Sequence, residues 1–285
     1  MPARPYVLAI VVFWMASTSW LVRREVWPYF RSGEPPPYTI DLADEARQHA
    51  EAIRWNILRG GKVIGVAMTK VTYRDSDDTF ELHNDIEKLD LGMSGLLQVK
   101  GMKGLIRVSR EGKLREIQAD FGFNFSGLAD VQAHVEGAVK DQYFTPRCRI
   151  VYVLGRGLAD PGLTNKEITL DPIPVPSSVS VLNPLHPVNR IAGLRHGQHW
   201  RMPLVDPLRD AVAGILGTRP GLRFLEADVL PESKTCRYNS KDWPCLVVEF
   251  RGEDMTARIW IREADGIVLR HEATVAGDEL VLERQ

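Results

Sequence analysis

Long stretches of the chain alternate apolar and polar residues with a period of two, the pattern of a β-strand with one buried face. The clearest stretch is 114–125, where one face would carry Ile117, Ala119, Phe121, Phe123 and Phe125. Residues 131–140 repeat the pattern, with Val135 among the apolar positions. Strands of parallel sheets are usually apolar on both faces, so this alternation predicts an antiparallel sheet.

Turn signals separate further strands. Gly60-Gly61 predicts a tight hairpin turn between a strand that starts at Ile53 and a second strand over 62–73. The run "RDSDD" predicts a hydrated turn before a strand that starts at Thr79. From 245 to 284, the turns "RGED", "ADG" and "AGDE" recur at about ten-residue intervals, which predicts a meander.

Helix signals are few. The uncharged segment 6–22 predicts an N-terminal helix, and residues 42–52, which are rich in alanine and follow Asp41 as a cap, predict a short one. A second short helix is predicted over 208–217, ended by Gly217. Together with the strands, these signals predict a mainly β fold: an antiparallel curved sheet or incomplete β-barrel with a few short helices, plus an N-terminal transmembrane or signal helix.

Proline-rich segments divide the chain. "RSGEPPPYTI" predicts an extended, semi-rigid linker, and a second proline-rich stretch near the middle predicts a connector. The expected organisation is an anchor or signal segment (1–30), a linker (31–40), a first β-rich half (41–157), a connector (158–192) and a second β-rich half (193–285). We expect the two halves to pack into one domain.

The N-terminal segment has three open interpretations. Its seventeen uncharged residues, Tyr6 to Val22, are at the lower limit for spanning a bilayer. The first is an uncleaved signal anchor with the bulk of the chain outside the cytoplasm. The second is a cleaved signal peptide, and the third is a membrane anchor with the bulk of the chain in the cytoplasm. Arg23 and Arg24 favour the last, because positive residues prefer the cytoplasmic side, whereas the nearby tryptophans suit either interface. We expect the first: a single-pass protein of the cell membrane with a periplasmic bulk.

Charge and composition narrow the partners. Lys plus Arg is 36 and Asp plus Glu is 37, so no basic excess points to nucleic acid, and none is expected as a partner. The 44% hydrophobic and 26% charged content is that of a globular protein.

Three segments carry a resemblance to a known group of proteins: "WNILRGGKVIGVAMTKV", "WRMPLVDPLRDAVAGIL" and the closing "MTARIWIREADGIVLRHEATVAGDELVLER". They resemble the opening strand pair, the mid-chain strand and helix, and the final hairpins of extracytoplasmic bacterial domains of unknown function. The resemblance covers most of residues 53–284 in pattern. It implies a half-barrel similar to the lipoprotein carrier fold of the bacterial envelope, and it brings no catalytic residues.

Residues suited to chemistry are scattered. His196 and His199 lie in "LRHGQHW", but residues three apart on a strand face opposite sides, and no zinc-ligand spacing appears. Trp200 is predicted to seat a strand in the core. Cys148, in "TPRCR", is predicted to be a buried strand cysteine, with a nucleophile activated by the flanking arginines as the alternative. No cofactor motif was found, and no cofactor is expected.

The two remaining cysteines enclose the segment "CRYNSKDWPC". A disulfide between Cys236 and Cys245 would close the base of a hairpin, and such bonds persist outside the cytoplasm. We predict this bond for a periplasmic chain.

The leading functional hypothesis is a non-enzymatic, membrane-anchored extracytoplasmic protein that binds an apolar ligand, such as a lipid or acyl chain, or an envelope partner protein. The residues expected to line the ligand site are Ile117, Phe121, Phe123, Phe125 and Val135. One alternative is a metal- or cysteine-dependent hydrolase that uses His196, His199 or Cys148. Another is a structural scaffold module of an envelope complex.

Overall fold

The computed structural model describes residues 4–21, 46, 51–89, 98–110, 112–125, 129–154, 163–169, 172–175, 188–204, 223–253, 255–275 and 278–285. In this part of the chain, the helix α1 (Arg4–Leu21) precedes sixteen strands. The strands are β1 (Ile53–Arg59), β2 (Lys62–Arg74), β3 (Thr79–Leu89), β4 (Gln98–Ser109), β5 (Leu114–Phe125), β6 (Ala129–Lys140), β7 (Tyr143–Leu154), β8 (Leu163–Thr169), β9 (Ile173–Pro174), β10 (His199–Leu204), β11 (Arg223–Val229), β12 (Lys234–Tyr238), β13 (Lys241–Arg251), β14 (Met255–Arg262), β15 (Val268–Val275) and β16 (Asp278–Arg284).

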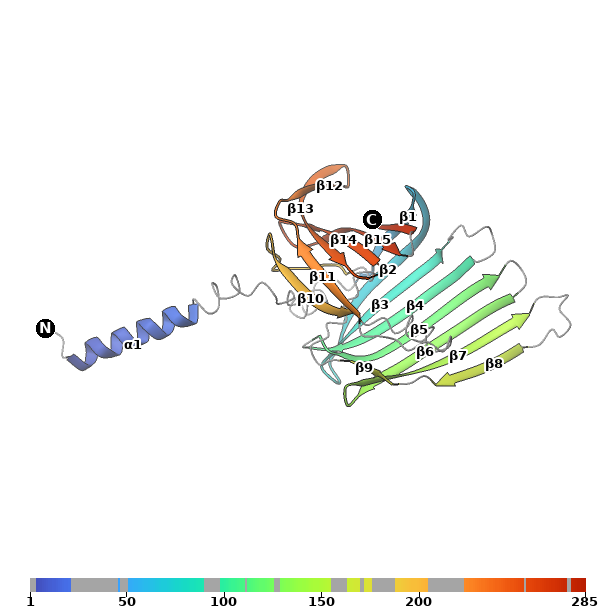
Figure 1. Ribbon diagram of the computed structural model, residues 1–285, viewed down its shortest axis with the longest axis horizontal. Coiled ribbons are helices and arrows are strands. Elements are labelled where there is room, and N and C mark those ends of the chain that lie inside the picture. Colours follow the sequence, from blue (N-terminus) through green and yellow to red (C-terminus); the bar gives the residue numbers. More distant parts are fainter. Residues whose placement is uncertain are drawn as a thin grey trace.

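The strands join into one antiparallel sheet in the order β10-β11-β13-β14-β15-β16-β1-β2-β3-β4-β5-β6-β7-β8, with β12 beside β13 and β9 beside β7. Figure 1 shows β3–β8 side by side as a broad panel, while β10–β15 run at a steep angle to it near one end. Within the described residues, the outermost strands of this order, β10 and β8, are not paired with each other. The prediction of a mainly β, antiparallel, curved and open sheet is therefore confirmed.

Strand β1 joins the C-terminal strands to the N-terminal ones. Ile57 lies opposite Leu282 of β16 on one side and opposite Gly65 of β2 on the other. The first strand of the chain therefore lies between its second and its last.

The larger hydrophobic core surrounds this junction. Its buried residues come from β1, β2, β10, β11, β13, β14 and β15 and include Ile191 before β10, with Trp55, Trp200 and Leu225 among the most deeply buried. The indole Nε1 of Trp55 donates to the Thr69 hydroxyl at 3.0 Å, so the polar atom of this buried ring is satisfied. The burial of Trp200, at 1% exposure, confirms the prediction that it seats a strand in the core.

A second core covers one face of the long strands β2–β7. Its members are Val71, Phe80, Ile106, Val108, Leu114, Ile117, Phe144, Ile173 and Val175, with Ala46 packed against them. Period-two alternation places these side chains on one face of the panel and the charged side chains on the other. The long strands thus present an apolar face and a charged face.

The predicted turns are found where expected. Gly60 and Gly61 connect β1 and β2 with φ of +55° and +77°, a backbone region that glycine enters without steric cost. The segment "RDSDD" forms the turn between β2 and β3. The Tyr73 hydroxyl donates a hydrogen bond to Asp78 of this turn (2.5 Å), and Arg110 binds the same carboxylate. Protein side chains therefore hydrogen-bond the Asp78 carboxylate.

Two boundaries differ from the prediction. Ala46 is helical, but Glu51 and Ala52 lie outside a helix, because the chain is already entering β1 at Ile53. The predicted connector 158–192 contains the strands β8 and β9. Among the described strands, β8 pairs only with β7, and its side chains from 165 to 169 are mostly exposed, so this stretch has no buried face to produce an apolar alternation. The linker 31–40 and the predicted helix 208–217 lie outside the described residues.

The predicted N-terminal helix is present as α1, and Figure 1 shows it clear of the sheet. Its described side chains include Phe13 at 75%, Trp14 at 67% and Met15 at 60% exposure. Within the described part of the chain, no helix reaches both the length and the apolar character that crossing a membrane requires. The role of α1 as an anchor or signal peptide stays a prediction.

Glu249 on β13 makes the stability of the C-terminal strands depend on pH. Hydrogen bonds from Arg251 and from Arg258, each 2.9 Å, hold the pKa of this carboxyl below its ordinary value of 4.5. A depressed folded-state pKa contributes stability that is complete above the ordinary pKa and is lost as pH falls through the lowered one. We expect Glu249→Gln to reduce the acid-dependent part of unfolding below pH 4.5 by up to about 1 kcal/mol, measured by urea titrations at several pH values. Glu232→Gln, an exposed control, should leave this pH profile unchanged.

Candidate functional site

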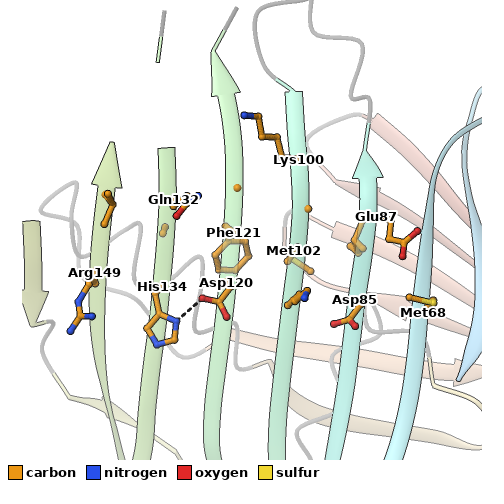
Figure 2. Close-up of a pocket in the computed structure, with 16 residues that line it drawn as sticks. Met68, Asp85, Glu87, Lys100, Met102, Asp120, Phe121, Gln132, His134 and Arg149 are labelled. Carbon is orange, nitrogen blue, oxygen red and sulfur yellow. Dashed lines mark hydrogen bonds and ion pairs between the residues drawn. The ribbon is translucent and has the colours of Figure 1, made fainter. Parts of the chain in front are cut away.

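A hollow of about 830 Å³ lies across β2–β7 (Figure 2). One wall is a row of directly opposed residues, one from each strand: Met68, Asp85, Lys103, Asp120, His134 and Arg149. The next row on the same face supplies Glu87, Gly101, Gly122, Gln132 and Val151. The row between them, which includes Met102 and Phe121, also borders the hollow, although alternation turns the side chains of this row toward the apolar face. The hollow therefore opens on the charged face of the panel.

Two glycines form the lowest part of this hollow. Gly101 and Gly122 are opposed across β4 and β5, just after a register shift between Val99 and Gly101. A Cβ at Gly101 would meet only the Ile86 carbonyl oxygen, at 3.4 Å, and one at Gly122 would meet the Lys100 Cβ, also at 3.4 Å. Neither glycine has a positive φ, so the backbone does not require glycine there. Their missing side chains are what leaves the sheet surface open.

Some charges around the hollow are already paired. His134 Nδ1 lies 2.7 Å from Asp120 Oδ1, and the Lys100 ammonium lies 2.6 Å from Asp130. The Lys100 ammonium and a hydrogen bond from Asn124 hold the pKa of Asp130 below its usual range. In the described residues, Asp85, Glu87, Lys103 and Arg149 have no ion pair or side-chain hydrogen bond.

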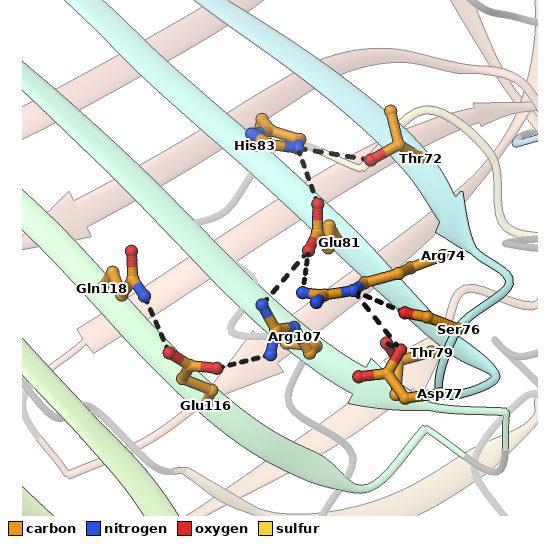
Figure 3. A network of polar contacts seen from close by, with 10 residues as sticks. All are labelled: Thr72, Arg74, Ser76, Asp77, Thr79, Glu81, His83, Arg107, Glu116 and Gln118. Atoms are coloured by element: carbon orange, nitrogen blue, oxygen red, sulfur yellow. Dashed lines mark hydrogen bonds and ion pairs between the residues drawn. The ribbon is translucent and has the colours of Figure 1, made fainter.

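Further along the same face, opposed charges do pair (Figure 3). Arg107 binds Glu81 at 3.2 Å and Glu116 at 2.6 Å, and Arg74 reaches Glu81 at 3.4 Å. Glu81, Arg107 and Glu116 are direct cross-strand neighbours, as are Asp85, Lys103 and Asp120 four residues away on each strand. The same cross-strand arrangement thus forms ion pairs around Arg107, whereas in the described residues Asp85 and Lys103 at the hollow stay unpaired.

The residues predicted to line an apolar site fall into two groups. Ile117 and Val135 are buried at 7% and 4% exposure and belong to the packed interior of the apolar face. Phe121 and Phe123 are half-buried, and their rings stack with centroids 6.2 Å apart. The side chain of Phe125 lies outside the described residues. The structure therefore brings Phe121 and Phe123 together at a less sealed end of the apolar face.

The two histidines considered for a metal have separate partners. His199 Nδ1 lies 2.7 Å from Asp228 Oδ1, whereas His196 Nδ1 lies 3.2 Å from the Leu230 carbonyl oxygen and Nε2 lies 3.6 Å from Glu263. Within the described ranges, no group of three or more His, Cys, Asp or Glu side chains is arranged to hold a metal ion.

Cys148 lies on β7, toward the opposite end of the strand order from His199 on β10. Its side chain is buried, and this burial raises the pKa of the thiol. The alternative in which neighbouring arginines activate it is wrong, because alternation turns Arg147 and Arg149 toward the charged face. The prediction of a buried strand cysteine is confirmed.

Cys236 and Cys245 are both free thiols in this structure, and the disulfide between them stays a prediction. They lie on the paired strands β12 and β13, but Cys236 is opposite Trp243 and Cys245 is opposite Lys234. Such diagonal neighbours lie on the same face of the strand pair. A hydrogen bond from the Cys245 thiol lowers the pKa of Cys236 and raises that of Cys245.

The hollow was not predicted from the sequence, although one signal for it exists. A glycine inside an alternating strand marks a bulge or a place where another chain or ligand approaches closely. Gly101 and Gly122 both interrupt otherwise regular strand patterns. Only the register shows that they are neighbours.

No family model matches the chain, and no curated protein matches it. Among solved structures, the chain is similar to the crystal structure of a β-barrel-like protein of the domain of unknown function DUF1849 from Brucella abortus. The TM-score is 0.42 and the identity 8%, over 82% of this chain and 96% of that one. The likeness carries no function to this chain, and the resemblance to lipoprotein carriers stays a prediction.

Proposed function

We propose that this protein is a non-catalytic, membrane-anchored binding protein of the bacterial envelope, with its β-sheet outside the cytoplasm. In this proposal α1 inserts into the bilayer and the sheet binds an apolar ligand, such as a lipid or acyl chain, or an envelope partner protein. The observation that carries the proposal is the exposed, uncharged surface that α1 presents from Phe13 to Leu21.

This surface is costly in water. Phe13, Trp14 and Met15 are each at least 60% exposed, and burying a large apolar side chain stabilises it by about 1.5–3 kcal/mol. From Tyr6 to Ala16 the sequence has no charged residue. A helix on the surface of a soluble protein normally has a polar face toward water, and this segment lacks one. Its 18 residues rise roughly 27 Å, close to the hydrocarbon thickness of about 30 Å.

The apolar-ligand part of the proposal is supported by the stacked pair Phe121 and Phe123. Their half-buried rings lie on the apolar face beyond the fully buried cluster of Phe80 and Phe144. Aromatic rings that are only partly covered are the usual lining of a site for an acyl chain or another apolar group. Mass spectrometry of organic extracts tests this part: lipid at near-equal molar ratio supports it. Lipid-free protein from several preparations contradicts it and favours the scaffold alternative.

Membrane fractionation tests the anchor. We expect the full chain in the membrane fraction, resistant to high salt and released by detergent. The double variant Phe13→Arg/Met15→Arg should move most of the chain to the soluble fraction, because arginine at a helix centre costs about 2.5–3.5 kcal/mol per residue in the bilayer. Ser19→Arg, near the end of α1, is the matched control and should stay in the membrane. Wild-type chain that is soluble without detergent would contradict the anchor.

A further inference from the structure

The hollow on the charged face has an acidic end and a basic end. Asp85 and Glu87 lie on β3, whereas Arg149 lies on β7, and Figure 2 shows them on opposite sides of the hollow. The order β3-β4-β5-β6-β7 contains four strand spacings. At about 4.8 Å each, they place β3 and β7 roughly 19 Å apart. A ligand that satisfies both ends carries a cation and an anion separated by about this distance.

Several of these charged side chains have no ion-pair partner in the described residues. Asp85 is directly opposite Lys103, yet no ion pair forms between them in the described residues. On the same face, the equivalent neighbours Glu81 and Arg107 lie 3.2 Å apart. The hollow therefore has unpaired acidic side chains on one side and an unpaired arginine on the other, whereas the neighbouring charges around Arg107 are paired. This arrangement indicates that the hollow complements a charged ligand.

The two glycines at the centre of the hollow also limit the shape of the ligand that fits there. Gly101 and Gly122 leave backbone exposed at the centre of the hollow, where any larger residue fits the backbone conformation. A glycine in a strand interior allows another backbone to approach closely, and register shifts are frequent beside binding sites. The middle of the hollow therefore accepts a main chain rather than a bulky group.

We propose that the hollow binds an extended peptide segment of about six residues, with a cationic residue over Asp85 and Glu87 and an anionic residue against Arg149. The segment lies across the strands, and its backbone passes over Gly101 and Gly122. This inference rests on the proposed binding role and names the chemistry of a partner protein, but it is independent of the membrane anchor.

Three capped hexapeptides test the proposal on the full chain in detergent, by isothermal titration calorimetry. Their sequences are Lys-Ala-Val-Ala-Val-Asp, Lys-Ala-Val-Ala-Val-Lys and Asp-Ala-Val-Ala-Val-Asp, each acetylated and amidated. We expect the first to bind with a Kd below about 1 mM and the other two at least roughly fivefold more weakly. Equal affinity for all three peptides, or no binding of the first at about 1 mM, overturns the proposal.

Charge exchange separates recognition from a structural effect. Arg149→Glu makes both ends of the hollow acidic, so the peptide with two lysines should become the preferred ligand. The double variant Asp85→Lys/Glu87→Lys should instead prefer the peptide with two aspartates. A folding defect would weaken all three peptides alike, and unchanged preferences in folded variants contradict the proposal.

Filling the floor tests the path of the backbone. Gly122→Val should weaken the Lys…Asp peptide by roughly tenfold, whereas Gly104→Ala, on the opposite face with ordinary contacts to Asn84, should have no effect. Competition by O-phosphoethanolamine as strong as that of the peptide would show a headgroup-sized site and overturn the peptide proposal. Because these measurements are made in detergent, their failure leaves the fractionation result for α1 unaffected.

Discussion

Replacing Trp55 by alanine should lower the free energy of unfolding by about 3–5 kcal/mol, the range for removing a large aromatic side chain from a core. Trp55 is 0% exposed on β1, and β1 is the strand that joins the two groups of strands. The edge of its ring meets His271 at a centroid distance of 5.5 Å, and its Nε1 donates to Thr69. Its loss therefore opens a cavity and removes a buried hydrogen bond at the junction of the sheet. Urea denaturation followed by circular dichroism measures the effect.

Two other substitutions divide this cost into its parts. Thr69→Val removes only the acceptor of the indole hydrogen bond and should cost about 1 kcal/mol. Arg54→Ala, one residue away on the exposed side of β1, should change stability by less than about 0.5 kcal/mol. A Trp55→Ala variant no less stable than Arg54→Ala would show that β1 is not the strand that holds the two parts together.

Alternation predicted the strands well where one face is buried. Strand β5 follows its predicted segment from Leu114 to Phe125, and the Gly60-Gly61 hairpin is where the sequence places it. Strand β8 was missed because β7 is its only partner among the described strands and its side chains from 165 to 169 are mostly exposed. A strand without a buried face has no apolar period, so local sequence holds little signal for it.

Long-range register was beyond the sequence argument, and the hollow depends on it. Asp120 and His134 lie fourteen residues apart in the sequence, and only the pairing of β5 with β6 brings their side chains to 2.7 Å. The same limit applies to the cysteines. Cys236 and Cys245, which are predicted to form a disulfide, lie on paired strands and are diagonal neighbours there. A shift of one residue in register changes which side chains are opposed, and sequence spacing does not show it.

The apolar face makes a second large effect testable. Phe144 is 0% exposed, and its ring covers Gly137 of β6 so closely that a Cβ at Gly137 would lie 2.5 Å from Phe144 Cζ. Phe144→Ala should cost about 3–5 kcal/mol through the cavity that it leaves. Gly137→Ala alone should cost about 1–3 kcal/mol, because the methyl group forces the ring from its position. Both values come from urea titrations of the full chain.

The double variant tells whether the two residues form one packing unit. Removing the ring relieves the contact with Phe144, but a Cβ at Gly137 would still lie 2.8 Å from the Thr145 carbonyl oxygen, so relief is partial. We therefore expect Gly137→Ala to cost less in the Phe144→Ala background than alone, with a coupling of about 0.5–3 kcal/mol. Additive costs would mean that Phe144 does not pack on the backbone of β6. The glycine at 137 would then reflect the Thr145 contact alone, and the apolar face would be held by its side chains without this aromatic cover.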